Sequence, residues 1–171
     1  GLFVSVDHGV HWEELQTRPV SLIKALDISP ADSSNRHSIA IGTYGGGAYV
    51  SHTGGADWII ANRGLNTTRI GGISVSPAYG ADDTLYSSAK GYLLQSDNRG
   101  GSWEQIPVSY QSLRKRIVNK LIKLGLPRET GKELLAFKEI QPVYPNAVTL
   151  SPDFATDNSL FIGTRYHGLY H

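Results

Sequence analysis

Three octapeptides decide the fold of this chain: SVDHGVHW at residues 5–12, SHTGGADW at 51–58 and SDNRGGSW at 96–103. Each begins with serine, has glycine at its fifth position and ends on one of the three tryptophans of the sequence. Successive tryptophans follow one another at intervals of 46 and 45 residues. A motif that repeats with a fixed period of this length predicts an array of similar structural units.

A second motif repeats with the same period. Ser-Pro pairs end at Pro30, Pro77 and Pro152, and each is followed by a polar loop and an apolar run, SIAIGT, TLYSSA or SLFIGT. A glycine-led run comes next (GAYVS, GYLLQS and GLYH), and the chain opens with a similar run, GLFVS. Alternating apolar residues between Gly, Pro, Asn and Asp favour strands over helices. Each unit of about 45 residues therefore predicts the four short strands of a β-propeller blade, whereas a β-sandwich would require both motifs to repeat by accident.

The repeats predict an all-β chain, a partial β-propeller of four-stranded antiparallel blades with about 3.5 blades in residues 1–171. The blade units start near residues 1, 47, 92 and 168, and no helix is expected between residues 24 and 106. We expect two whole blades, the outer half of another and the inner three strands of a fourth. Such a chain would not close a ring by itself, and its first partners would be the remaining blades of a parent propeller. A strained three-bladed ring is the alternative.

Residues 107–142 interrupt the repeat. Apolar residues fall at helical spacing across residues 113–124, and Gly125 ends that pattern. Thr130 and Glu133 form a capping-box pattern that predicts a second short helix. With eight basic and three acidic residues, the segment is expected to be a basic helical insertion between blades. It could pack on the ring, cover a ligand face, or bind an anionic polymer or membrane surface.

The octapeptides resemble the Asp box, Ser-x-Asp-x-Gly-x-x-Trp, of BNR repeats in the sialidase-like superfamily. The stretch SPDFATDNSLFIGT at residues 151–164 resembles the strand region that precedes the box in bacterial repeat proteins of this kind. The resemblance covers the chain outside residues 107–142 and implies a β-propeller. It implies no single activity, because the family includes sialidases, xyloglucanase-like hydrolases, sortilin-type receptors and photosystem assembly factors. It favours an extracellular or cell-surface location.

We interpret the octapeptides as structural turns between the third and fourth strands. The third residue can accept backbone N–H bonds, the glycine permits a positive φ, and the tryptophan packs between neighbouring blades. All three tryptophans are therefore expected in equivalent buried positions at the blade periphery. The competing hypothesis, a catalytic Asp7, is weakened because two of the three boxes lack the aspartate. The residues assigned to this frame are Ser5, Asp7, Gly9, Trp12, Ser51, Thr53, Gly55, Trp58, Ser96, Asn98, Gly100 and Trp103.

A candidate ligand face lies on the other side of the disc from the octapeptides. The strands of a blade alternate in direction, so the turns between second and third strands and the links between blades share that opposite face. Arginine and tyrosine there would suit a carboxylated or planar ligand, although a solvated set of polar loops is the competing interpretation. The candidate binding residues are Arg18, Tyr44, Arg63, Asn66, Arg69, Lys90, Arg165, Tyr166 and His167.

The sequence thus predicts a non-catalytic β-propeller scaffold or binding module from a larger BNR-repeat protein, with a glycan or protein ligand. The alternative is a fragment of a sialidase-like or xyloglucanase-like glycoside hydrolase. A xyloglucanase-like reaction needs two facing carboxylates, and Asp27, on a first strand near the axis, is a candidate for one of them. Asp82, Asp83, Asp153 and Asp157 fall in loops on the octapeptide side and are expected to cap turns.

Composition argues against several other classes. The 171 residues are 40% apolar and 18% charged, which suits a folded domain, and the net charge of +1 gives no reason to expect nucleic acid as a partner. No run of about 18 apolar residues occurs, so no transmembrane segment is expected. Cysteine is absent, and the six histidines, including His8 and His11, lack a metal-ligand spacing. Neither a metal nor a cofactor is expected.

Overall fold

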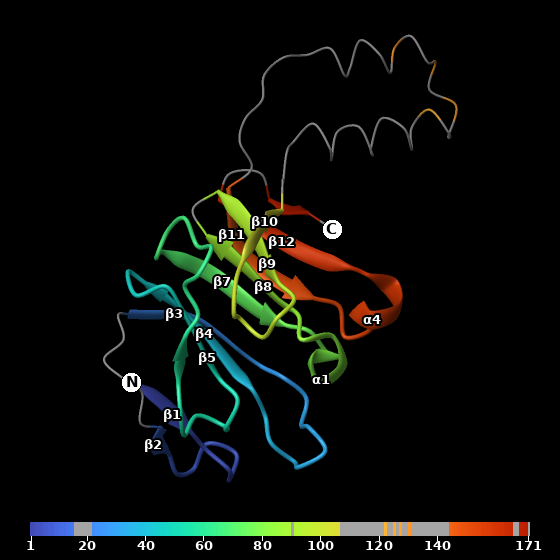
Figure 1. Cartoon of the computed structure of the whole chain (residues 1–171). Helices are drawn as coiled ribbons and strands as arrows, with labels where there is room; N and C mark the ends of the chain where they lie inside the picture. The colour runs from blue at the N-terminus through green and yellow to red at the C-terminus, as the bar shows by residue number, and fades with distance from the viewer. Residues whose placement is uncertain are drawn as a thin grey trace.

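The computed structural model describes residues 1–15, 22–89, 91–106, 122, 125, 127, 130, 144–165 and 168–170. Its strands form four antiparallel sheets that follow one another in chain order, here numbered blades 1 to 4 (Figure 1). Blade 1 contains β1 (Leu2–Val4) and β2 (Glu13–Leu15). Blade 2 contains β3 (Leu22–Ile28), β4 (Ile39–Tyr44), β5 (Ala48–Ser51) and β6 (Ile59–Ile60). Blade 3 contains β7 (Ile70–Val75), β8 (Leu85–Ala89), β9 (Tyr92–Ser96) and β10 (Glu104–Ile106), and blade 4 contains β11 (Pro145–Leu150), β12 (Leu160–Thr164) and β13 (Leu169–Tyr170).

Within each blade the strands are hydrogen-bonded in the order in which they occur along the chain. At one end of blade 2, Ile39 pairs with both Ile28 and Ser51, and at the other end Leu22 pairs with Tyr44. The first strands of neighbouring blades pack together, β3 on β7 and β7 on β11, so they lie innermost. This architecture is a partial β-propeller of four-stranded antiparallel blades, and it confirms the predicted fold class. The second octapeptide begins at Ser51, so the end of the blade with Ile28 and Ile39 lies on the octapeptide face. The end with Leu22 and Tyr44 lies on the opposite face.

The hydrophobic core lies mainly between successive blades. Between blades 2 and 3 it includes Val50, Leu85 and Trp103, all buried. Between blades 3 and 4 it includes Tyr86 and Val148. A sheet with two apolar faces needs a neighbour on each side, so each blade depends on the blades that flank it.

Two glycines allow the first strands of blades 3 and 4 to approach each other closely. A Cβ atom at Gly71 would lie 2.7 Å from the carbonyl oxygen of Asn146, and one at Gly72 would lie 2.9 Å from the backbone nitrogen of Val148. Both distances are shorter than real Cβ contacts, so β7 and β11 could not pack this way with any larger residue. The approach places Gly71 beside Asn146 on the opposite face.

The expectation of no helix between residues 24 and 106 is wrong. A one-turn helix, α1 (Tyr79–Asp82), lies in the loop between β7 and β8, and α4 (Phe154–Asp157) lies in the matching loop of blade 4 (Figure 1). Asp83 ends α1 in a left-handed conformation and donates its N–H to the carbonyl of Tyr79. The side chain of Asp82 accepts bonds from the Ser76 hydroxyl and the Thr84 N–H. These local bonds stabilise a helical turn that the alternation of apolar residues does not reveal.

The side chain of Asp157 accepts the equivalent bonds in blade 4, from the Ser151 hydroxyl and the Ser159 N–H. The predicted basic insertion at residues 107–142 lies outside the described residues except for Ile122, Gly125, Pro127 and Thr130, and it stays a prediction. No helix in the described part of the chain is both long and apolar enough to cross a membrane.

Candidate functional site

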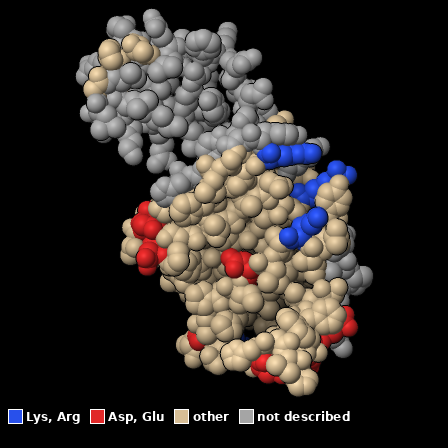
Figure 2. Space-filling model, turned by 180° about the vertical axis from the view of Figure 1, so that it is seen from behind, with Lys and Arg blue, Asp and Glu red and all other residues tan. Residues whose placement is uncertain are grey.

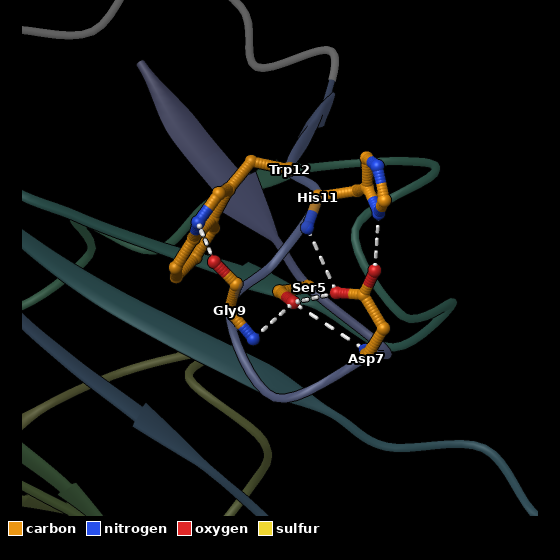
Figure 3. A network of polar contacts seen from close by, with 5 residues as sticks. All are labelled: Ser5, Asp7, Gly9, His11 and Trp12. Carbon is orange, nitrogen blue, oxygen red and sulfur yellow. Dashed lines mark hydrogen bonds and ion pairs between the residues drawn. The ribbon is translucent and has the colours of Figure 1, made fainter.

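The first octapeptide forms a turn closed by its own side chains (Figure 3). The Ser5 hydroxyl accepts the N–H of Gly9 at 2.8 Å and donates to Asp7 Oδ1 at 2.8 Å. Asp7 Oδ1 also accepts the N–H of His11 at 2.9 Å, and Asp7 Oδ2 contacts His11 Nδ1 at 2.5 Å. The backbone N–H and then the ring of His11, with the Ser5 hydroxyl, lower the pKa of Asp7 to about 2. This carboxylate is therefore engaged in holding the turn.

The other two octapeptides have the same frame with different residues at the third position. In the second, Ser51 Oγ accepts the N–H of Gly55 at 2.8 Å, and Thr53 Oγ1 accepts the N–H of Asp57 at 2.8 Å. In the third, the corresponding acceptors are Ser96 and Asn98, which bind the N–H groups of Gly100 and Ser102, each at 2.9 Å. An aspartate, a threonine or an asparagine thus makes the same bond to the backbone four residues later.

The tryptophans depart from the expected equivalence. Trp103 is buried with 4% exposure, Trp58 is half-buried and Trp12 is exposed at 64%. The indole N–H of Trp103 donates to the carbonyl of Ala61 in the link between blades 2 and 3, at 2.7 Å. The indole N–H groups of Trp12 and Trp58 instead donate to the glycine carbonyl of their own turns, each at 3.0 Å. The expectation of three equivalent buried tryptophans is therefore wrong, because burial requires a complete preceding blade.

The opposite face contains a pocket of about 650 Å³ near the first strands. Its described lining includes three of the predicted binding residues, Tyr44, Arg69 and Arg165. The other described lining residues are Lys24, Ile70, Gly71, Gly91, Tyr144, Pro145 and Asn146. We call this the opposite-face pocket.

β-Bulges at matching positions of three first strands shape this pocket. The strand register shifts between Ile23 and Ala25, between Ile70 and Gly72, and between Pro145 and Ala147. The residues inside the shifts are Lys24, Gly71 and Asn146, and all three line the pocket. A bulge leaves one residue out of the regular ladder and redirects its side chain, so bulges often occur beside binding sites.

Arg69 is held over the ring of Tyr44. Its guanidinium carbon lies 4.9 Å from the ring centroid, and the two residues also form an isolated antiparallel bridge. The carbonyl of Thr68 accepts the N–H groups of Gly45 and Gly47, which ties the link between blades to the β4–β5 turn. The stacking and the bridge thus hold the guanidinium in a defined orientation.

Basic side chains dominate the pocket. Lys24, Arg69 and Arg165 are exposed, and no aspartate or glutamate is among the described lining residues. In the view from behind, basic side chains gather in the upper part of the visible face, apart from most of the acidic ones (Figure 2). Arg165 lies next to Tyr144 across the sheet, since its N–H donates to the Tyr144 carbonyl at 3.2 Å. A pocket with this lining favours an anionic ligand.

Not every predicted binding residue reaches the pocket. Arg63 and Asn66 are exposed on the link between blades 2 and 3 and are not among the residues that line it. Four further candidates, Arg18, Lys90, Tyr166 and His167, lie outside the described residues. Sequence reasoning missed three of the lining polar residues, Lys24, Tyr144 and Asn146. Their only signal was their position at the start of, or just before, a first strand.

Asp27, the candidate catalytic carboxylate, joins two blades. Its Oδ2 accepts the Ser74 hydroxyl at 3.0 Å and the Val75 N–H at 2.8 Å, both on β7, and its Oδ1 accepts the N–H of Ile28 at 2.9 Å. The two bonds from β7 connect the first strands of blades 2 and 3. In the described part of the chain no group of three or more histidine or acidic residues could hold a metal ion.

Comparison with known proteins supports the fold. No family model matches the sequence, and no curated protein matches it. Among solved structures, YCF48 bound to a D1 peptide is similar, with a TM-score of 0.53 and 14% sequence identity over 88% of this chain. The match covers 37% of the YCF48 chain, so this chain spans little more than a third of that β-propeller protein. At this identity, the similarity shows a shared fold alone.

Proposed function

We propose that this chain is part of a non-catalytic β-propeller scaffold that binds a protein partner through the opposite-face pocket, and that the ligand is an acidic, extended segment. The observation that carries this proposal is the convergence of Lys24, Arg69 and Arg165 on one pocket. These residues come from β3, the link between blades 2 and 3, and the end of β12. YCF48 has a similar fold and is bound to a peptide in its solved structure, which supports a peptide as the ligand.

The pocket chemistry suits an extended acidic segment. Guanidinium groups bind carboxylates through paired N–H donors, and Arg69 is already oriented by Tyr44. The rings of Tyr44 and Tyr144 add flat surfaces with polar ends, the kind of surface that is enriched at protein interfaces. A volume of about 650 Å³ can hold one or two side chains and the backbone between them.

We also propose that the chain belongs with the Asp-box propellers of the BNR type, and that its octapeptides are structural. The shared bonds from the third residue to the backbone four positions later support this assignment. A catalytic role would require a specific acid at that position. Thr53 and Asn98 fill it without changing the turn, so the position serves as a hydrogen-bond acceptor.

Fluorescence anisotropy tests the ligand assignment, with a labelled glutamate-rich peptide and its glutamine analogue as the matched pair. The glutamate peptide should bind, and Arg69→Gln and Arg165→Gln should each weaken binding by about tenfold, because each removes a charge-assisted contact. Added salt should weaken binding as well. Arg63→Gln is the matched control, since Arg63 is also an exposed arginine but does not line the pocket.

Three results would contradict the proposal. Equal binding of the glutamine analogue would show that the pocket does not recognise acidic side chains. Equal losses in Arg63→Gln and Arg69→Gln would indicate general attraction to a basic face. Binding of a sialylated oligosaccharide in place of the peptide would replace the protein partner with a glycan.

A further inference from the structure

A second pocket lies on the octapeptide face, between blades 2 and 3. Its volume is about 510 Å³. It is formed by the loop from Ser29 to Ser38, the α1 loop of blade 3, and residues of the second and third octapeptide turns. Pro30, Ala31, Pro77 and Ala78 contribute apolar walls. We call this the octapeptide-face pocket, and nothing in the proposed function uses it.

Tyr79, a lining residue of this pocket, has an unsatisfied hydroxyl. The side chain is 4% exposed, and its hydroxyl makes no hydrogen bond. Burial raises the pKa of Tyr79 to about 12, so the group stays protonated and can donate at neutral pH. A buried donor without an acceptor is unfavourable for folding, and such a group calls for an explanation.

Blade 4 shows that the fold does not need this hydroxyl. Phe154 occupies the position of Tyr79 in the matching loop, SPDF in place of SPAY, and also begins a one-turn helix. Its ring packs edge-on against Tyr86 of blade 3, with the centroids 5.7 Å apart. A phenyl ring therefore suffices at this point of the repeat, and the hydroxyl of Tyr79 has no evident structural role.

The charged neighbours of Tyr79 are Arg99 and the carboxylates of Asp83 and Asp82. His52 stacks on its ring with centroids 6.4 Å apart, and His52 Nδ1 lies 3.3 Å from the Ser38 hydroxyl. Burial, together with the nearby Arg99, lowers the pKa of His52, which favours the neutral ring. Arg99 and Arg36 line the same pocket from different blades.

Each of these arginines is held by a carboxylate. Arg99 Nε contacts Asp83 Oδ1 at 2.6 Å, and one terminal nitrogen of Arg36 lies 3.5 Å from Asp32 Oδ2. An arginine has five N–H donors, so one carboxylate leaves several of them for another acceptor. The two ion pairs position the guanidinium groups without using all of their donors.

We propose that the octapeptide-face pocket is a second binding site and that it takes a small organic carboxylate with a flat apolar body. The Tyr79 hydroxyl donates to the carboxylate, and Arg36 and Arg99 complement its charge. The proline and alanine walls cover the apolar body. The ligand satisfies a buried donor that the fold itself leaves without a partner; among the described residues the Ser88 hydroxyl is the other such group.

Benzoate is the probe, and proton NMR of the His52 ring is the readout, with the resonances assigned by His52→Gln. Millimolar benzoate should produce a saturable shift of the His52 signals. Benzamide has the same ring and size without the charge and should give no saturable shift. Inorganic phosphate has the charge without the apolar body and should also fail. Binding of either control in place of benzoate would overturn the assignment of the ligand class.

Tyr79→Phe separates binding from folding, because it places the residue of blade 4 at the same position of blade 3. We expect the melting temperature to rise by a few degrees, since an unsatisfied buried group is removed, while benzoate affinity falls at least tenfold. Arg99→Gln should also weaken benzoate binding, and Arg63→Gln, which does not line this pocket, should not. A lower melting temperature in Tyr79→Phe, or unchanged benzoate affinity, would overturn the proposal.

Discussion

The first and third octapeptide turns have the same internal bonds and different surroundings. Ser5 and Ser96 each accept the N–H of the glycine four residues later, at 2.8 and 2.9 Å. At their ends, Trp12 is exposed and its N–H returns to its own turn, whereas Trp103 is buried and its N–H crosses to another blade. The turn is thus determined by the octapeptide itself. The environment of the tryptophan is determined by the blade that precedes it.

The largest effect expected from this difference concerns the two tryptophans. Trp103→Ala should lower the free energy of unfolding by roughly 3–5 kcal/mol, because it leaves a cavity between blades 2 and 3 and removes the bond to Ala61. Trp12→Ala should cost less than about 1 kcal/mol, because that ring is already exposed. Urea unfolding followed by circular dichroism measures both. Similar losses in the two variants would show that the local turn, and not the neighbouring blade, governs stability.

Gly64 and Gly54 separate the effect of a contact with another blade on stability from the effect of backbone conformation alone. A Cβ at Gly64 would lie 2.2 Å from the Trp103 carbonyl oxygen, and Gly64 has φ +85°. Gly54 in the second turn also has a positive φ, +68°, but a Cβ there would meet no atom within 4 Å. Gly64→Ala should therefore cost roughly 2–4 kcal/mol and Gly54→Ala about 1–2 kcal/mol. If the two thermal unfolding curves coincide, the contact of Gly64 with Trp103 contributes nothing.

The serines test whether identical bonds have different values in different surroundings. Ser96→Ala leaves the N–H of Gly100 buried without an acceptor and should cost about 1–2 kcal/mol. Ser5→Ala exposes the N–H of Gly9 to water and should cost about 0.5 kcal/mol or less. Denaturant titrations of the two variants measure this difference. A larger loss for Ser5→Ala would reverse our ranking of the two turns.

The smallest expected effect is a pH dependence confined to the first turn. The backbone N–H of His11 is the main cause that lowers the pKa of Asp7 to about 2. A lowered carboxylate pKa stabilises the fold above its unfolded value of 3.8, and this contribution is lost as the pH falls toward 2. Carbon NMR should give an Asp7 titration midpoint near pH 2. In the third turn the N–H of Ser102 is bound by the neutral Asn98, so its resonance should show no step near pH 2, and neither should that of the His11 N–H in Asp7→Asn.

The sequence predicted the repeating part of the molecule well, because two motifs share a period and each motif stabilises its own turn. It could not predict the exposure of Trp12, since the octapeptide contains no information on whether another blade covers it. The α1 turn was missed although its residues, Ser76 to Thr84, show the hydrogen-bonding side chains that form it. The alternation of apolar residues ends with β7, before this loop begins, so it says nothing about the conformation of the loop.

The lining of the opposite-face pocket was predicted in part, for a different physical reason. The sequence predicted Tyr44, Arg69 and Arg165 because the alternating direction of the strands shows which loops lie on the opposite face. Few loops lie there, so few polar residues are candidates. Lys24 and Asn146 were missed because each lies in a β-bulge, where alternation no longer tells which way a side chain points. A bulge is visible in strand register and has no clear signature in a single sequence.

The hydrogen bond from Trp103 to Ala61 also bears on the order in which the blades fold during synthesis. The acceptor lies 42 residues before the donor, so at 5–20 residues per second a ribosome completes Ala61 roughly 2–8 seconds before Trp103. When the third turn leaves the ribosome, the surface that it docks on has already been synthesised. Each new blade can then be added to the end of a folded row, and besides the side of blade 1 on which Trp12 is exposed, only the most recently made blade has an uncovered face. Growth from the N-terminus in this way limits the apolar surface that a nascent propeller offers to other chains.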